Sequence, residues 1–559
     1  MDAPVRVGGW VGRHAVELYV RTYTTMLQSS GWIRLEALQQ AHIGMESTLH
    51  PLAAQPEVDM GALIYAVRRL PAAIAGCRRV VLGQSSQAIR QELGADVLSW
   101  QKVEAPARRR RWYYDGKETI AALIASPSDI DDLIPTLVAY QLEWNKLHRT
   151  LHAITVGEER QAAGASEDDW TRLQQAWTIG FEDILHAVRQ RACDMQIRLI
   201  GGTDVGYARS AHRWWQPLGS ALQEMGLAEA PVYFVSSNLH SLVNVLSGVS
   251  RRLEAEIIEF TKENDRDLYA ELEHIESGET HASRDNWLYF AARGFFDSHP
   301  KSADFRKVRS QIEREMGIRH IRARAGVAES AAQIFKLADL DPSCFDPRVG
   351  RTDPLRLKAS AAAIINVDYP LGLASYHLLR EICEQVHRVT GVYVMGKAAT
   401  LNADVGDVLI SNAVYNEHSG DTYWLDNCFT AADVQPHLVY GSALDNQRAV
   451  TVRGTFLQNR DYLDFYYRGR YTIVEMEAGP YLDACYENSM PGRHPMGENV
   501  NMARLGFDLG IIHYASDTPY TQARTLGARG LSYRGMDSTY ASAVAVARRI
   551  LAQEGCLLE

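Results

Sequence analysis

Residues 355–559 contain short apolar runs separated by helical patterns, and this alternation is the feature that most constrains the fold. Strands flanked by helices imply a layered α/β domain whose sheet is covered on both faces. Ligands of such sheets bind at the carboxyl ends of the strands. Two of the intervening segments, Leu371–Val389 and Ser538–Leu551, are expected to be helices. The runs expected to form strands are Ala362–Val367, Val392–Met395, Val408–Ile410, Ala449–Val452, Tyr471–Val474 and Ile511–Ala515.

The preceding residues, 1–345, have a largely helical pattern and no assigned role. Apolar residues recur at near-helical spacing over 130–154 and 170–188. Three strand-like runs end in small and polar residues, which favours a small α/β element, most clearly from about residue 197. We place the boundary between the two parts at Asp339–Pro354, where three prolines and repeated aspartates interrupt the helical pattern. The strand-like runs are Arg79–Leu82, Ile197–Ile200 and Pro231–Val235.

Charge and composition exclude several classes of protein. The chain has 58 Lys and Arg against 68 Asp and Glu, a net charge of −10, which argues against broad binding of nucleic acid or anionic membrane. We expect a cytoplasmic protein, since the sequence has no recognisable secretory signal and no apolar run near the ~20 residues that span a bilayer. Its seven cysteines are scattered, which disfavours disulfides and zinc. We expect no metal and no cofactor.

Carboxylates follow three of the expected strands. Asp368 comes directly after the first strand of the carboxy-terminal part, the segment 475–477 reads Glu-Met-Glu, and Ser516-Asp517 follows the last strand. A carboxylate at a sheet edge lies where burial and neighbouring charges can tune its pKa for proton transfer. The strand ends are therefore the candidate site.

The segment VEMEAG at 474–479, followed by a strand ending in Ser516-Asp517, resembles the superfamily of purine nucleoside phosphorylase, methylthioadenosine nucleosidase and AMP nucleosidase. Residues 392–396 and 406–410, which read VYVMG and GDVLI, and residues 452–457, VRGTFL, are similar to further segments of that family in the same order. The resemblance runs from Lys358 to the end. It implies a three-layer α/β domain with a central mixed sheet, acting on a small purine nucleoside or nucleotide.

The resemblance also implies roles for individual residues. Glu477 would bind the ribose hydroxyls and Met476 would pack against the sugar. Asp517, oriented by Ser516, would protonate or hydrogen-bond the purine at N7 as the N-glycosidic bond breaks. Phe456 would stack on the base. These residues have alternative roles. Asp517 can cap a helix that starts at Thr518-Pro519, and Glu477 can be an ordinary buried, hydrogen-bonded carboxylate. Met476 and Phe456 can belong to the core.

The acceptor of the sugar stays open at this point. Phosphorolysis needs a phosphate site, for which Lys397, Thr400, Arg448 and Arg453 are the candidates. For hydrolysis, the resemblance implies a glutamate near the first strand that activates water. No matching glutamate is evident there, and Asp368, which can also cap the next helix, is the nearest carboxylate. A catalytically inactive nucleotide-binding or sensing module is the alternative function. Family members commonly assemble, so the resemblance implies a homo-oligomer.

The amino-terminal part carries one further pattern, the basic run Arg108–Arg111 followed by Trp112, Tyr113 and Tyr114. Basic and aromatic residues together can stack on bases. In a chain of this net charge, we expect a solvated or intersubunit surface instead. The amino-terminal part would then supply substrate selectivity, for example toward a 5′-substituent, or subunit contacts or regulation.

Overall fold

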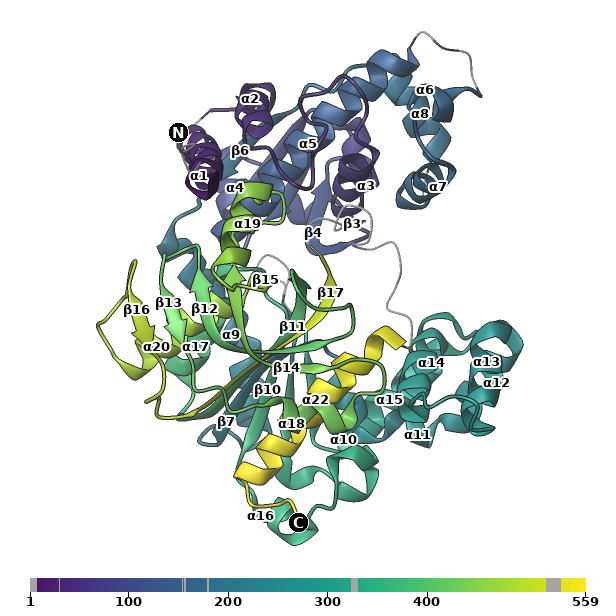
Figure 1. The fold of residues 1–559 in the computed structure, drawn as a ribbon, viewed down its shortest axis with the longest axis vertical. Helices are drawn as coiled ribbons and strands as arrows, with labels where there is room; N and C mark the ends of the chain where they lie inside the picture. Colours follow the sequence, from purple (N-terminus) through teal and green to yellow (C-terminus); the bar gives the residue numbers. More distant parts are fainter. Residues whose placement is uncertain are drawn as a thin grey trace, which may run out of the picture.

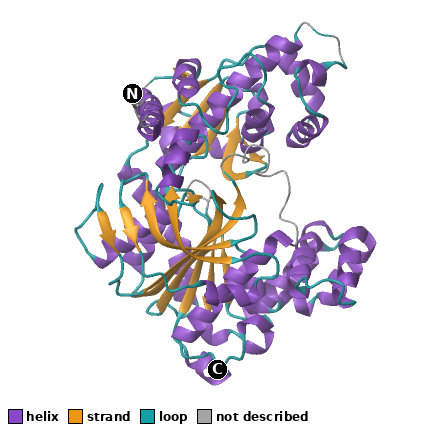
Figure 2. Ribbon diagram, in the orientation of Figure 1, coloured by secondary structure: helices purple, strands orange, loops and turns teal. Residues whose placement is uncertain are grey.

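The computed structural model describes residues 8–29, 31–152, 154, 157–177, 180–322, 330–518 and 534–558. The chain forms two lobes, an N-terminal lobe of residues 8–200 and a C-terminal lobe of residues 204–558, each with its own sheet (Figure 1). Helices surround the strands in both lobes (Figure 2), which confirms the α/β class.

The N-terminal lobe has a six-stranded sheet in the order β1-β6-β2-β5-β4-β3. Strands β6, β2 and β5 are parallel, and β4 pairs antiparallel with β5 and β3. Two of the three strand-like runs predicted from the sequence are β2 and β6. The sequence does not predict β1, β3, β4 and β5, so this part is less helical than expected. The strands are β1 (Ile33–Arg34), β2 (Arg79–Gly83), β3 (Gln101–Ala105), β4 (Arg108–Tyr114), β5 (Thr119–Leu123) and β6 (Gln196–Ile200).

Several helices of the N-terminal lobe, among them α3 and α5, pack apolar residues on this sheet. The longest, α5, begins at Pro127, where the Asp129 carboxylate accepts a hydrogen bond from the amide of Ala125 at 2.6 Å. Its stripe of Leu133, Leu137 and Tyr140 is fully buried. The helices are α1 (Gly8–Leu27), α2 (Glu36–Gly44), α3 (Met60–Arg69), α4 (Ser86–Leu93), α5 (Pro127–Leu151), α6 (Glu159–Ala162), α7 (Glu167–Ala176) and α8 (Phe181–Gln190).

The C-terminal lobe is built on a mixed sheet of eleven strands within the described chain, in the order β16-β13-β12-β14-β15-β11-β7-β10-β9-β8, with β17 pairing β11 and β12. Strands β10, β7, β11 and β17 are mutually parallel, whereas β15 runs antiparallel to β11. The strands are β7 (Pro231–Ser237), β8 (Ile318–Ile321), β9 (Ala332–Lys336), β10 (Ala363–Asp368), β11 (Arg388–Thr400), β12 (Val408–Asn416), β13 (Thr422–Trp424), β14 (Ala443–Thr451), β15 (Ile473–Glu475), β16 (Asn499–Asn501) and β17 (Asp508–Asp517).

Both faces of this sheet are buried, because alternate residues of its strands face different helices. On β7, Val232 and Phe234 pack with α9, α17 and α20, while Tyr233 and Val235 pack with α10 and α22. The helices are α9 (Asp204–Glu224), α10 (Ser241–Ser247), α11 (Val249–Arg252), α12 (Glu254–Asn264), α13 (Arg266–Glu276), α14 (Arg284–Ser298), α15 (Ser302–Glu315), α16 (Pro354–Ala359), α17 (Leu373–Gln385), α18 (Ala431–Val434), α19 (Arg460–Arg468), α20 (Ala478–Ser489) and α22 (Asp537–Gln553).

The division of the chain differs from the boundary expected at Asp339–Pro354. Strands β7, β8 and β9 precede that stretch, yet they pair in the same sheet as β10. The prolines there start 3-10 turns and helix α16, and Val349 is fully buried, so they shape a packed connection and not a linker. The C-terminal lobe therefore begins near residue 204, and helices α11–α15 form an extension beside its sheet (Figure 1).

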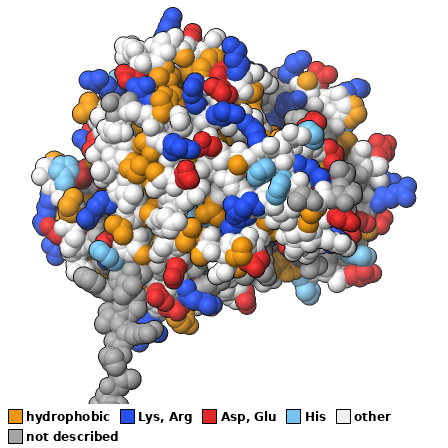
Figure 3. All heavy atoms as spheres, turned by 90° about the horizontal axis from the view of Figure 1, so that it is seen from above, with side chains coloured by type: hydrophobic (Ala, Val, Ile, Leu, Met, Phe, Trp, Pro, Cys, Tyr) orange, Lys and Arg blue, Asp and Glu red, His pale blue; other side chains and the backbone are white. Residues whose placement is uncertain are grey.

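Segments of the C-terminal lobe reach into the N-terminal lobe. Helix α19 packs against α1, and the amide of Thr48 donates to the carbonyl of Gln458 at 2.8 Å. Phe456 lies between the lobes and is 3% exposed. Acidic and basic side chains are interspersed on the face seen from above (Figure 3). None of the helices in the described ranges is both long and apolar enough for a membrane span.

Candidate active site

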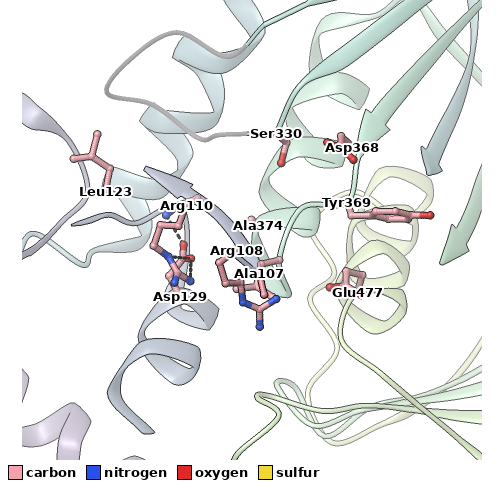
Figure 4. Close-up of a pocket in the computed structure, with 12 residues that line it drawn as sticks. Ala107, Arg108, Arg110, Leu123, Asp129, Ser330, Asp368, Tyr369, Ala374 and Glu477 are labelled. Carbon is pink, nitrogen blue, oxygen red and sulfur yellow. Dashed lines mark hydrogen bonds and ion pairs between the residues drawn. The ribbon is translucent and has the colours of Figure 1, made fainter. Parts of the chain in front are cut away.

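A cavity of about 290 Å³ lies between the two lobes, at the carboxyl end of β10 (Figure 4). Its walls come from β4, β5 and α5 of the N-terminal lobe and from the loops before α17 and α20 of the C-terminal lobe. The lining residues are Ala107, Arg108, Arg110, Leu123, Ala125, Asp129, Ser330, Asp368, Tyr369, Leu371, Ala374 and Glu477.

The C-terminal wall brings together two of the carboxylates predicted from the sequence. Asp368 ends β10 and is 6% exposed, and Glu477 stands between β15 and α20. Tyr369 lies next to Asp368, and its hydroxyl is 2.8 Å from that of Tyr514. Asp368 and Glu477 thus border one cavity although 109 positions separate them in the chain.

Glu475 has a structural position behind this wall. Its carboxylate accepts hydrogen bonds from the amides of Glu477 and Ala478, both at 2.7 Å, and from the hydroxyl of Thr451. That hydroxyl in turn accepts from the amide of Gly479 at 2.8 Å. Glu475 therefore caps the start of α20, and Glu477 is the glutamate of this pair that faces the cavity.

The protonation of Glu477 is set by burial and by its neighbour. Burial, together with the negative charge of Glu475, raises the pKa of Glu477 to about 8, while Arg108 acts in the opposite direction. Burial raises the pKa of Glu475 to about 6 against the hydrogen bonds that it accepts. At neutral pH Glu477 is therefore mostly protonated.

The N-terminal wall carries two arginines held by two aspartates of α5. Arg108 donates through Nη2 and Nε to Asp132, at 2.7 and 3.2 Å. Arg110 donates to Asp129 at 2.6 and 3.0 Å and to Asp132 at 3.1 Å. Figure 4 shows Arg110 turned toward Asp129, with Arg108 on the side that faces Glu477. The arginines hold the pKa of Asp132 well below its usual range against the effect of burial.

Asp517 lies at the end of β17, outside the described lining of the cavity. Register places it opposite Ala399 of β11, whose other neighbour is Val474 of β15. The ends of β15 and β17 thus flank β11 at one level of the sheet. Asp517 is 2% exposed, and its Oδ1 accepts a hydrogen bond from the amide of Thr518 at 2.7 Å. The helix start predicted after it, at Thr518-Pro519, falls mostly on residues 519–533, which lie outside the described residues.

Three other predicted residues lie around these strand ends. Met476 packs on a cluster that contains Val474, Tyr462 and Tyr466. The hydroxyl of Ser516 donates to the carbonyl of Ala398 at 3.4 Å. Phe456 does not line the cavity: it packs edge-to-face on Tyr65, with ring centroids 5.0 Å apart. Its surroundings are those of a core residue, the alternative to base stacking.

The four candidate phosphate ligands have separate surroundings. Lys397 is exposed on β11, and the guanidinium of Arg448 lies 5.3 Å from the ring centroid of Trp424. Thr400 is buried, and its hydroxyl accepts from the amide of Ala403 at 3.0 Å. Arg453 lines a different cavity, of about 480 Å³, beneath α1. None of the four lines the cavity between the lobes, so the structure does not assemble them there.

Comparison with known proteins gives a family. The model of a family of unknown function, DUF6909, matches residues 35–552, which include most of both lobes. The chain belongs to this family. No curated protein matches the sequence significantly.

Solved structures similar to this DUF6909 protein are nucleoside phosphorylases and nucleosidases. A uridine phosphorylase from Schistosoma mansoni in complex with thymidine is 10% identical over 35% of this chain and 72% of its own, with a TM-score of 0.27. A 5′-methylthioadenosine/S-adenosylhomocysteine nucleosidase from Colwellia psychrerythraea 34H, in complex with adenine, is 12% identical over 44% and 92%, with a TM-score of 0.30. The corresponding nucleosidase from Neisseria meningitidis is 14% identical over 43% and 94%, with a TM-score of 0.27.

The arginines of the cavity are what sequence reasoning missed in this DUF6909 protein. The expectation for the basic run is a solvated or intersubunit surface, but Arg110 is 8% exposed and lines the cavity between the lobes. Arg108, Arg110 and Trp112 alternate along β4 and so share one face, and Trp112 is fully buried. That alternation, with Asp129 and Asp132 three positions apart at a helix start, was the signal available in the sequence.

No group of three or more His, Cys, Asp or Glu side chains within the described ranges is arranged to hold a metal ion.

Proposed function

We propose that this protein cleaves the N-glycosidic bond of a purine nucleoside or nucleotide in the cavity between its lobes. One observation carries the proposal: Glu477 of the Glu-Met-Glu segment lines the cavity beside Asp368, and Asp517 ends a strand on the other side of β11. Strands lie about 4.8 Å apart, so two strand ends on either side of β11 are roughly 10 Å apart, a distance that a nucleoside can span.

The chemistry needs two carboxyl groups in different roles. Cleavage passes through a ribosyl cation, so the sugar must be held rigidly while the departing purine is neutralised. We assign Glu477 to the ribose hydroxyls, where an ionised carboxylate can accept two hydrogen bonds, and Met476 to packing against the sugar. Asp517, with Ser516 beside it, donates a hydrogen bond or a proton to the purine nitrogen N7.

The raised pKa of Glu477 fits a carboxyl group that receives its missing hydrogen bonds from the ligand. Hydrogen bonds donated by a sugar diol favour the ionised carboxylate. Binding a nucleoside would therefore lower the pKa of Glu477 from about 8 and release a proton near neutral pH. Asp368, on the same wall, is the group that we assign to orienting the acceptor, which is water in hydrolysis and phosphate in phosphorolysis.

The test is release of free base from a panel of purine nucleosides and their 5′-monophosphates, each with and without inorganic phosphate, followed by chromatography. Asp517→Asn and Glu477→Gln should each abolish release. Glu256→Gln, which removes an exposed carboxylate on α12, is the matched control and should leave release unchanged. Full activity in either of the first two variants would rule out the assigned roles.

A nucleotide-binding module without catalysis is the second candidate. It is favoured by the Asp517 carboxylate, because its Oδ1 already accepts a hydrogen bond from the amide of Thr518 and is thus engaged within the chain. Saturable binding of a nucleotide by calorimetry, with no base released under any condition of the panel, would support this candidate and contradict the first.

A further inference from the structure

We propose that Arg108 forms an anion subsite on the N-terminal wall, backed by Arg110, and that this subsite binds a phosphate group opposite Glu477. The phosphate is either the 5′-phosphate of the substrate or inorganic phosphate. This inference rests on the proposed function for the identity of the substrate, but binding of phosphate at Arg108 can be tested without turnover.

The hydrogen bonds of Arg108 leave one edge of its guanidinium for a ligand. Asp132 takes Nε–H and one hydrogen of Nη2, so the donors that remain are the second hydrogen of Nη2 and both hydrogens of Nη1, a nitrogen with no partner among the described residues. The side chain of Arg108 is 23% exposed and lines the cavity, whereas that of Asp132 is 3% exposed. A buried carboxylate thus fixes the guanidinium while its other edge stays accessible.

Arg110 lies deeper in the same wall and is incompletely paired. Its side chain is 5% exposed, and its Nη1 is buried without a hydrogen-bond partner among the described residues. A buried donor without an acceptor is costly, which favours the approach of an anion from the cavity that Arg110 lines.

The balance of charge behind the wall is positive. Arg69 stacks on Tyr65 at 3.4 Å and interacts electrostatically with both Arg108 and Asp132. Burial lowers the pKa of Arg69 to about 10, which still leaves it protonated at neutral pH. The three arginines 69, 108 and 110 face two carboxylates, those of Asp129 and Asp132, so one positive charge is not neutralised within this cluster.

Space for the ligand lies between Arg108 and Glu477. Each side chain influences the charge of the other across the cavity, yet no ion pair joins these two residues. Figure 4 shows them on opposing walls. A molecule whose sugar hydroxyls meet Glu477 can therefore place a phosphate at Arg108. A phosphate dianion suits the site because a guanidinium edge binds its oxygens with charge-assisted hydrogen bonds.

The experiment measures binding and base release for adenosine and its 5′-monophosphate, each with and without inorganic phosphate, in the wild type and in Arg108→Gln. Loss of a hydrogen bond to a charged group costs about 1.5–3 kcal/mol, so we expect Kd or KM for the phosphate-bearing ligand to rise roughly 10-fold to 100-fold. Adenosine alone should bind both proteins equally. Arg79→Gln, an exposed arginine of β2, is the control and should behave as wild type.

The two sources of phosphate give different results. If the 5′-monophosphate binds more tightly than adenosine and loses this advantage in Arg108→Gln, the subsite holds the 5′-phosphate. If adenosine is cleaved only with inorganic phosphate and its KM for phosphate rises in the variant, the subsite holds the co-substrate. Equal binding of every ligand by wild type and variant would overturn the proposal.

A double variant separates loss of phosphate binding from loss of stability. Arg108→Gln leaves the buried Asp132 with one partner fewer. Arg108→Gln/Asp132→Asn removes one charge of each sign, so it keeps the net charge of the wall unchanged, and it should show the same loss of phosphate binding. Phosphate-dependent binding that is lost in both variants, with no base released by the wild type, would support the subsite while contradicting the proposed reaction.

Discussion

Glu475 and Glu477 lie two residues apart and have different surroundings. Glu475 ends β15, and its carboxylate accepts hydrogen bonds from the amides at the start of α20. Glu477, which follows after the chain has turned, borders the cavity. The sequence predicts that one glutamate of the segment contacts the ligand, and the structure brings Glu477 to a cavity. The sequence does not predict that Arg108 and Arg110 lie opposite Glu477, because these arginines belong to the other lobe and only the fold makes them neighbours.

The raised pKa of Glu477 predicts a pH dependence of stability. Below its ordinary value of 4.5, this carboxyl is protonated in both states; between 4.5 and about 8, the unfolded chain releases a proton that the folded chain keeps. Its contribution to stability is therefore present at low pH and is lost as the pH rises to about 8. We expect the free energy of unfolding in urea to fall more between pH 5 and 8.5 in wild type than in Glu477→Gln.

A control variant makes this prediction specific to Glu477. Glu256→Gln, which removes an exposed carboxylate, should follow the wild-type profile. Parallel profiles of wild type and Glu477→Gln would contradict the prediction, because they would mean that Glu477 binds its proton equally in both states.

At the scale of elements, the expected strands were found close to their predicted places, for example Ala362–Val367 as β10 and Ile511–Ala515 within β17. Short apolar runs between helical patterns identify strands well because burial on both faces requires them. The pattern does not show which strands pair with one another when a long stretch of chain separates them. For this reason β7 was recognised as a strand but was assigned to the wrong side of the division between the lobes.

The two lobes fit closely together at the start of α17. Gly372 has φ +52° and ψ −123°, and a Cβ atom there would lie 2.2 Å from the Ser128 hydroxyl, which accepts a hydrogen bond from the amide of Leu373 at 2.9 Å. We expect Gly372→Ala to destabilise the protein by about 1–3 kcal/mol from backbone strain. It should also raise KM, since Leu371 and Ala374 line the cavity.

The control for Gly372→Ala is Gly294→Ala in α14, where nothing lies within 4 Å of the added methyl group. This variant should be neutral or gain up to about 1 kcal/mol from helix propensity. Urea unfolding and steady-state kinetics measure both effects. A Gly372→Ala protein with wild-type stability and KM would show that the lobes can separate at this point without cost.

For the whole molecule, the cavity exists only because the lobes are held together. A buried chain of polar groups supports the junction: His42 Nε2 is 2.9 Å from His50 Nδ1, and His50 Nε2 is 2.7 Å from a Glu143 oxygen. Phe456 of the C-terminal lobe packs on this cluster, with its ring centroid 6.0 Å from that of His42 and 6.4 Å from that of His50. Phe456 thus lies among buried side chains of the N-terminal lobe.

Phe456 therefore offers a test that separates a role at the junction from a role in base stacking. Truncation of a buried phenylalanine costs about 3–5 kcal/mol, so Phe456→Ala should lower stability by that amount. Phe456→Leu keeps most of the apolar contact and should retain most of the stability and the substrate affinity. If Phe456→Leu instead folds as wild type but loses affinity for nucleosides, measured by calorimetry, the aromatic face itself contacts the base, and the junction must open to admit it.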